Sequence, residues 1–139
     1  NTLMVKCKIY KKNSDPKALY LLLPHKKKDH DNFLKETKVN LDLITYNDFD
    51  YDLDEYVEKE VKVIKSEAEF KYVNINDEMF ISLENAIIEL EFESEDQEER
   101  FIDKDWEYES FTLTLDLIGP NSNDFINYTD SELFSLEII

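Results

Sequence analysis

Phe111-Thr-Leu-Thr-Leu-Asp-Leu-Ile118 alternates apolar and polar residues without interruption. Side chains on one face of a strand recur every two residues, so this alternation is typical of a strand with one buried face and one exposed face. Upstream of this run, Trp106 and Tyr108 alternate with acidic residues. We therefore predict a strand over Trp106–Ile118.

The same period recurs at the start of the chain. In Leu3–Tyr10 the apolar residues occupy the odd positions and Lys6 and Lys8 lie opposite them. Turn-forming residues at Asn13–Pro16 precede the apolar run Ala18–Leu23, which predicts an opening hairpin. Further strands are predicted at Val39–Tyr46, Glu67–Val73, Met79–Leu83 and Ala86–Glu93.

Three segments leave alternatives open. Asp54–Lys65 has valines at helical spacing and Glu/Lys pairs four residues apart, which favours a helix; the alternative is a strand with Val57, Val61 and Val63 facing inward. His25–Lys38 is predicted to be a loop or a short exposed helix. Leu133–Ile139 is either a short helix, because Thr129 and Glu132 have capping-box spacing, or a final strand.

These elements predict a mainly β (α+β) fold in one domain over residues 1–139. The expected architecture is an antiparallel β-sandwich or a curved sheet with one or two short helices. A length of 139 residues is ordinary for one domain, and a hydrophobic content of 42% supplies a core. The chain has no repeats and no linker long enough to separate two domains.

Charge is divided unevenly along the chain. Residues 1–40 hold ten lysines and four acids, a net charge of +6, whereas residues 41–139 hold six basic and twenty-nine acidic residues, a net charge of −23. Net charge of this size influences association and partner choice. The acidic region favours a basic partner and disfavours direct contact with nucleic acid, whose affinity for proteins comes largely from lysine and arginine.

Several catalytic and metal-binding classes are disfavoured. Gly119 is the one glycine, so neither a phosphate-binding loop nor a nucleophile elbow can be built. The only histidines, His25 and His30, lie in a lysine-rich run that we interpret as a solvated basic loop rather than a metal site. Alternate aspartates at 48–54 do not complete an EF-hand, because the required glycine and glutamate are missing. We expect no enzyme activity, no cofactor and no metal; a hydrolase using paired carboxylates is a minor alternative.

Three acidic segments share one pattern, with acids on one face of a predicted strand and apolar residues on the other. The first is Asp48–Asp54, the second Glu89–Glu95 and the third Asp105–Glu109. Their carboxylates are the predicted partner-binding residues: Asp48, Asp50, Asp52, Asp54, Glu89, Glu91, Glu93, Glu95, Asp105, Glu107 and Glu109. Interleaved aromatics that face outward would anchor a partner: Tyr46, Tyr51, Tyr56, Trp106 and Tyr108. The alternative is that these acids only keep sheet edges soluble.

The leading hypothesis is a non-enzymatic acidic binding protein of inhibitor or immunity type. Its nucleic-acid-like surface would cover a basic partner protein, such as a nucleic-acid-handling enzyme or a toxin. The alternative is a viral or bacterial assembly module that self-associates through its basic and acidic parts. A single cysteine, Cys7, predicted to be buried, fits a reducing compartment, and no apolar run reaches membrane-spanning length. We therefore expect a cytoplasmic protein with no membrane contact.

Overall fold

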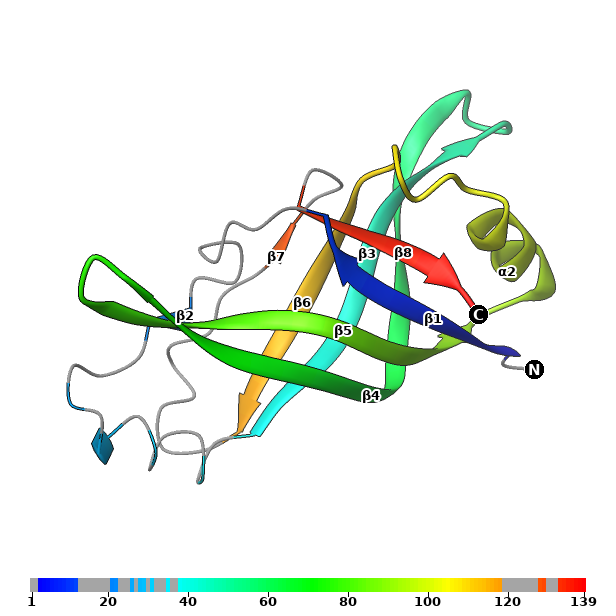
Figure 1. Ribbon diagram of the computed structural model, residues 1–139. Coiled ribbons are helices and arrows are strands. Elements are labelled where there is room, and N and C mark those ends of the chain that lie inside the picture. Colours follow the sequence, from blue (N-terminus) through cyan, green and yellow to red (C-terminus); the bar gives the residue numbers. More distant parts are fainter. Residues whose placement is uncertain are drawn as a thin grey trace.

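The computed structural model describes residues 3–12, 21–22, 26, 28–29, 31, 35, 38–118, 128–129 and 133–139. The strands are β1 (Leu3–Lys11), β2 (Leu21–Leu22), β3 (Lys38–Asp50), β4 (Glu55–Ile75), β5 (Glu78–Phe92), β6 (Phe111–Ile118), β7 (Tyr128–Thr129) and β8 (Phe134–Ile138), and helix α2 (Glu95–Ile102) follows β5. The strands form a single sheet in the order β7-β6-β3-β4-β5-β1-β8, with β2 paired to β5. The predicted mainly β fold is confirmed as a curved antiparallel sheet (Figure 1).

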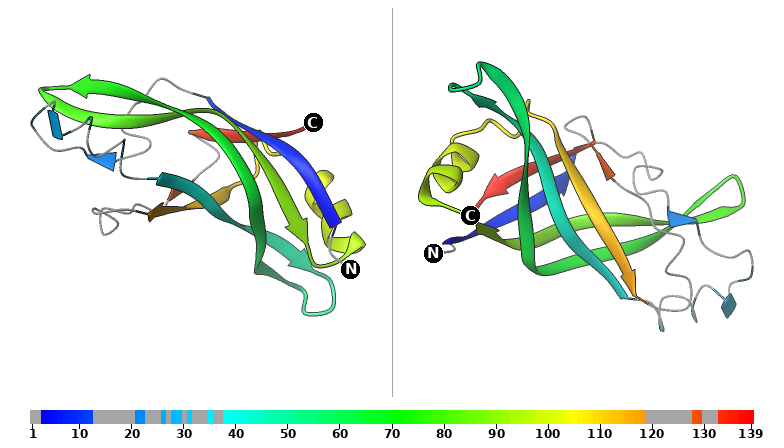
Figure 2. Two further views of the ribbon diagram at one scale, coloured as in Figure 1. Left: turned by 90° about the horizontal axis from the view of Figure 1, so that it is seen from below. Right: turned by 180° about the vertical axis from the view of Figure 1, so that it is seen from behind.

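The curvature comes from strand β4, which belongs to two parts of the sheet. Residues up to Lys62 pair with β3, and residues from Lys62 onward pair with β5. The ladder is irregular between Val63 and Lys65, and such bulges bend a strand. The sheet therefore folds over itself, so that β3 and β6 face β1 and β5 across the molecule (Figure 2).

The hydrophobic core lies between these two parts of the sheet. The inward residues of β1, Cys7 and Ile9, are fully buried, as the alternation predicts. Strands β3, β4, β5, β6 and β8 contribute further buried residues, including Ile44, Val61, Leu90, Leu113 and Leu136. Burial raises the pKa of the Cys7 thiol to about 12, so this cysteine is a core residue with little thiolate character.

The predicted helix over Asp54–Lys65 is wrong, because residues 55–65 lie within strand β4. Val61 is buried and Val57 and Val63 are half-buried, which is the alternative with those three valines inward. Branching at Cβ lowers helix propensity and suits a pleated surface. The strand preference of the three valines therefore outweighs the helical preference that the Glu/Lys spacing indicates.

Three other sequence predictions are corrected or settled by strand pairing. Met79–Leu83 and Ala86–Glu93 are parts of one strand, β5, in which Asn85 has a left-handed φ of 48° within a bulge of β5 itself. The opening hairpin is wrong, because β1 pairs with β5 and β8 while β2 pairs with β5. The segment at 133–139 contains strand β8, and not a helix.

Helix α2 was not anticipated from the sequence, although its start carries a recognisable signal. Ser94 caps the helix by accepting a hydrogen bond from the backbone N–H of Gln97 at 3.1 Å. Gln97 in turn accepts from the backbone N–H of Glu93 at 2.9 Å and donates to the backbone oxygen of Glu60 at 3.2 Å. Ser94 and Gln97 have capping-box spacing, and the acids of the first turn complement the helix dipole.

Removing this cap should weaken the fold measurably. We expect Ser94→Ala to lower the free energy of unfolding by about 1 kcal/mol, because the N–H of Gln97 loses its acceptor. Ser94→Thr keeps a capping hydroxyl and should lose much less. Urea denaturation followed by circular dichroism measures both variants, and equal stability of Ser94→Ala and the parent protein would contradict the role of the cap.

Candidate functional site

Asp48, on β3, lies at the centre of the most highly charged part of the molecule. The residue is only 5% exposed, and its carboxylate accepts hydrogen bonds from Arg100 Nε at 2.7 Å and Arg100 Nη2 at 3.1 Å. Lys59 Nζ lies 3.3 Å away and Lys104 Nζ 3.5 Å away. Asp48 therefore connects β3, β4, α2 and the segment that follows α2.

These contacts fix the ionisation of Asp48. The hydrogen bonds from Arg100 outweigh the cost of burial, and the pKa of Asp48 falls to about 2. The same hydrogen bonds raise the pKa of Arg100. The buried carboxylate is thus ionised at neutral pH and is occupied by the protein's own cations.

Arg100 is the only arginine in the chain, and its position uses the planar shape of the guanidinium. Besides the two bonds to Asp48, Nη2 donates to the backbone oxygen of Phe49 at 2.6 Å. The guanidinium carbon also lies 5.5 Å from the centre of the Tyr51 ring. A lysine could not make this combination of forked hydrogen bonds and ring contact.

An aromatic cluster holds α2 and the following turn against the sheet. Phe101, of α2, packs at 5.4 Å from the Tyr46 ring and at 4.7 Å from the Trp106 ring. Trp106 Nε1 donates to the backbone oxygen of Phe101 at 3.0 Å, and the Ser135 hydroxyl donates to the backbone oxygen of Trp106 at 2.7 Å. The acids around α2 are therefore carried on a well-packed support.

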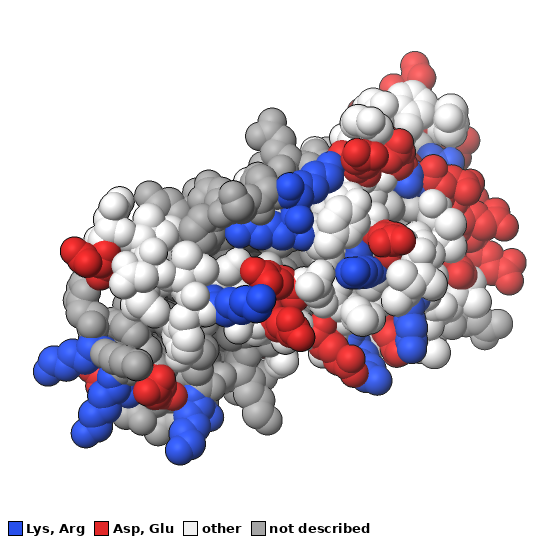
Figure 3. All heavy atoms as spheres, viewed as in Figure 1, with Lys and Arg blue, Asp and Glu red and all other residues white. Residues whose placement is uncertain are grey.

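The acids of this region gather at one end of the molecule. We define the acidic end as residues 50–55, at the β3–β4 turn, together with residues 93–109, which contain α2. These segments hold thirteen acidic and two basic residues, a net charge of −11 out of −17 for the chain. The two basic residues, Arg100 and Lys104, are both directed at Asp48. Figure 3 shows the acidic side chains concentrated at this end.

Exposed apolar side chains lie within the acidic end. Tyr51 is 77% exposed, Leu53 61% and Tyr108 77%, and Tyr56, directly after residues 50–55, is 71% exposed. Tyr46 and Trp106 are buried instead. Of the five aromatics proposed as anchors, three are therefore available to a partner and two belong to the core.

The first acidic segment follows the predicted division of faces only in part. Asp48 is buried, whereas Tyr51 and Leu53 are exposed. Asp48 lies on the inward face of β3, and the turn at residues 51–54 ends the alternation beyond it, which leaves Tyr51 and Leu53 exposed. Asp50 is half-buried and Asp52 and Asp54 are exposed. The alternation of Ile44 and Tyr46 on β3, continued by two residues, is the signal that would have placed Asp48 inside.

The second segment divides between the sheet and the start of α2. Glu89 lies 3.5 Å from Lys6, and Glu91 is paired in register with Lys62 on β4. Leu90 and Phe92 are buried on the opposite face, as predicted. Glu93 and Glu95 are exposed at the acidic end. The middle of the sheet is thus a surface of mixed charge.

The third segment is not a strand. Residues 106–108 form a turn, and β6 begins only at Phe111. Asp105 Oδ1 accepts from the backbone N–H of Glu107 at 3.2 Å, and the backbone oxygen of Glu107 accepts a hydrogen bond from Lys12 Nζ. Asp105, Glu107 and Glu109 are nevertheless exposed, so their carboxylates face solvent at the acidic end.

Other chemistry that the sequence raised finds no support within the described residues. They contain no group of three or more His, Cys, Asp or Glu side chains able to hold a metal, and no helix long and apolar enough to cross a membrane. His25, His30 and Glu132 of the predicted capping box lie outside the described residues, whereas Thr129 belongs to strand β7.

Comparison with known proteins adds no relative. No protein-family model, no curated protein and no solved structure matches this chain. We therefore infer function from the chemistry and geometry of the chain's own residues.

Proposed function

We propose that this protein is a non-enzymatic, acidic binding protein of inhibitor or immunity type, which covers a basic surface of another protein. The observation that carries the proposal is the acidic end, where a net charge of −11 surrounds exposed tyrosines and a leucine. Aromatic residues are enriched at the centres of protein interfaces, and charge accelerates the encounter of complementary partners.

The set of proposed partner-binding residues is smaller than the set that the sequence alone predicts. Asp52, Asp54, Glu93, Glu95, Asp105, Glu107 and Glu109 are exposed at the acidic end, with Asp50 at its edge. Asp48 is buried and binds Arg100, so it stabilises the acidic end without being available to a partner. Glu89 and Glu91 lie opposite lysines of neighbouring strands. A partner would therefore meet one end of the molecule and not a broad sheet surface.

The chemistry of this surface favours a partner that handles nucleic acid, and the single cysteine, the buried Cys7, fits a reducing compartment such as the cytoplasm. Closely spaced exposed carboxylates present negative charge as a phosphate backbone does, and would repel nucleic acid itself. A basic groove that normally holds nucleic acid is the complementary surface. Occupation of that groove would block the partner's activity.

A capture experiment tests this proposal. The purified protein is immobilised and exposed to lysate of its source organism at low salt, with and without added duplex DNA, and is then washed at high salt. We expect one basic protein in stoichiometric amount, released by salt and displaced by DNA, because charged contacts are screened within about 3 Å at 1 M salt. A captured protein that DNA does not displace would contradict occupation of a nucleic-acid groove, and no captured protein would contradict the proposal itself.

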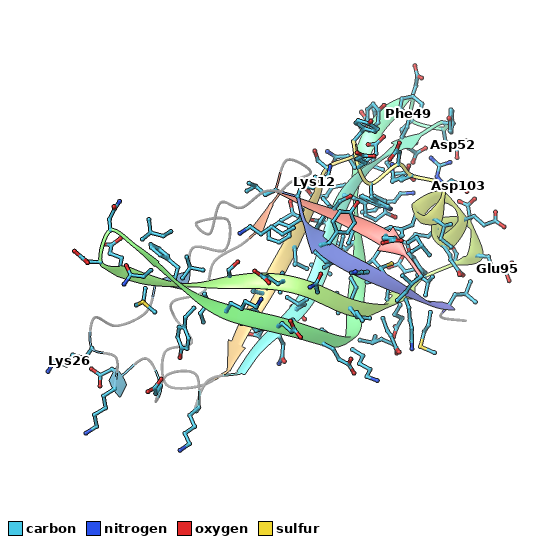
Figure 4. The ribbon with its side chains drawn as sticks, viewed as in Figure 1. Lys12, Lys26, Phe49, Asp52, Glu95 and Asp103 are labelled. Carbon is cyan, nitrogen blue, oxygen red and sulfur yellow. The ribbon has the colours of Figure 1, made fainter. Side chains whose placement is uncertain are left out.

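Self-association is a second candidate, favoured by the distribution of charge. Lys26, Lys28 and Lys35 are exposed, and Figure 4 places Lys26 at the end of the molecule opposite Asp52 and Glu95. The end of one copy that carries Lys26, Lys28 and Lys35 could therefore contact the acidic end of the next. Sedimentation velocity at low and high salt distinguishes this function, which requires concentration-dependent oligomers that dissociate as salt is raised.

A further inference from the structure

The turn between β3 and β4 presents an apolar surface that the fold itself does not need. Tyr51, Leu53 and Tyr56 expose most of their side chains within six residues. Their turn projects from the body of the sheet, with Phe49 and Asp52 at its tip in Figure 4. Contiguous exposed apolar side chains on a folded protein mark an interaction surface. We call residues 49–56 the hairpin tip.

The hairpin tip is held in shape by its own contacts. The Phe49 ring packs edge-on against Tyr51 at 4.9 Å and against Tyr56 at 5.2 Å. Asp50 Oδ1 accepts hydrogen bonds from the backbone N–H groups of Asp52 at 2.9 Å and Leu53 at 3.2 Å. Asp54 adopts a left-handed φ of 55°, which completes the turn. A preformed surface of this kind loses little conformational entropy on binding.

Arg100 shows which cation suits this surface. Its guanidinium lies over the Tyr51 ring while it donates to the carboxylate of Asp48. Tyr51 remains 77% exposed despite that contact, and Tyr56 is 71% exposed. The carboxylates of Asp52, Asp54 and Glu55 are exposed in the same turn. Arg100 thus contacts an aromatic ring and a carboxylate, and the solvent-exposed surface of the same turn offers the same two groups side by side.

We propose that the hairpin tip binds arginine side chains of a basic partner protein, with guanidinium groups over Tyr51 and Tyr56 and hydrogen bonds to the neighbouring carboxylates. This inference rests on the proposed function and specifies the partner's contact residues. Arginine is favoured over lysine because a planar, weakly hydrated guanidinium stacks on aromatic rings and binds carboxylates through two N–H groups. Lysine would gain only the charge attraction.

The test compares two labelled peptides of equal length and charge, one of arginines and one of lysines, by fluorescence anisotropy. We expect the parent protein to bind the arginine peptide at least about ten-fold more tightly, a difference of about 1.4 kcal/mol. The double variant Tyr51→Leu/Tyr56→Leu keeps apolar side chains but loses the aromatic faces, and should bind both peptides equally. Tyr108→Leu, at an equally exposed tyrosine outside the hairpin tip, is the matched control and should keep the preference.

Two results of the peptide experiment would overturn this inference. One is equal affinity of the parent protein for the two peptides; the other is an arginine preference that survives in the double variant. Circular dichroism of the double variant confirms that it folds, which we expect because both tyrosines are largely exposed. If the double variant still captured the basic partner with the parent's affinity, the proposed function would stand and the arginine-binding role of the hairpin tip would be wrong.

Discussion

Replacing Asp48 with asparagine is expected to lower the free energy of unfolding by about 2 to 3 kcal/mol. The substitution keeps the size of the side chain but leaves Arg100, Lys59 and Lys104 clustered without their anion. Breaking a buried ion pair by removing one partner costs about 3 to 5 kcal/mol, and the partial exposure of Arg100 and Lys59 lowers the expected cost in this case below that range. Urea denaturation measures the loss.

Two further variants control for this result. Asp42→Asn removes an exposed carboxylate from the same strand and should change stability by less than about 0.5 kcal/mol. Arg100→Lys keeps the charge but loses the forked hydrogen bonds, and should lie between the parent and Asp48→Asn. If Asp48→Asn were as stable as Asp42→Asn, Asp48 would not hold α2 to the hairpin.

The stability difference between the parent and Asp48→Asn should decrease as pH falls. The pKa of Asp48 is about 2 in the folded protein and near 3.8 when unperturbed, so folding favours the ionised form by about 2 kcal/mol. That contribution is fully present above about pH 4 and is lost as pH falls through 2. The parent and Asp48→Asn should therefore converge in stability between pH 4 and pH 2, and a gap that stays constant over this range would contradict the assignment.

Neutralising the acidic end should have the largest effect on partner binding. In Asp52→Asn/Asp54→Asn/Glu95→Gln/Glu107→Gln, four exposed carboxylates lose their charge without loss of packing. We expect the association rate with the captured partner to fall at least about ten-fold at low salt, because these charges steer the encounter. The difference should shrink as salt rises, and surface plasmon resonance over a salt series measures it.

The matched control changes the same amount of charge elsewhere. Four exposed acids lie away from the acidic end (Figure 1): Glu67 and Glu69 on β4, Asp77 in the β4–β5 turn and Glu78 on β5. Neutralising these four residues should leave the association rate within about two-fold of the parent value, since steering depends on charges close to the interface. Equal losses for the two variants would mean that total charge alone, and no particular surface, attracts the partner.

Local periodicity predicts much of this fold because one face of each strand is buried. The buried residues Cys7 and Ile9 of β1, and Phe111, Leu113 and Leu115 of β6, follow the two-residue period. Strand pairing is harder to predict from local sequence, because the partners of a strand can lie far along the chain. β1 pairs with β5 and β8, and nothing local to residues 3–11 indicates this.

The candidate site was harder to predict because its central interaction is long-range. Asp48 and Arg100 are 52 residues apart, and their contact exists only because α2 packs beside the β3–β4 hairpin. A pattern of alternate acids does not distinguish a buried aspartate from an exposed one. The exposed tyrosines were foreseen as anchors only on condition that they face outward, and the turn at residues 51–54 determines which of them do.

Backbone hydrogen exchange of the free protein and of its complex with the captured partner tests the central claim most directly. The proposal predicts slowed exchange at residues 50–56 and 93–109, with exchange on the β4–β5 turn unchanged. Protection of β5 around Glu89 and Glu91, with the acidic end exchanging as it does in the free protein, would contradict the acidic end as the binding surface.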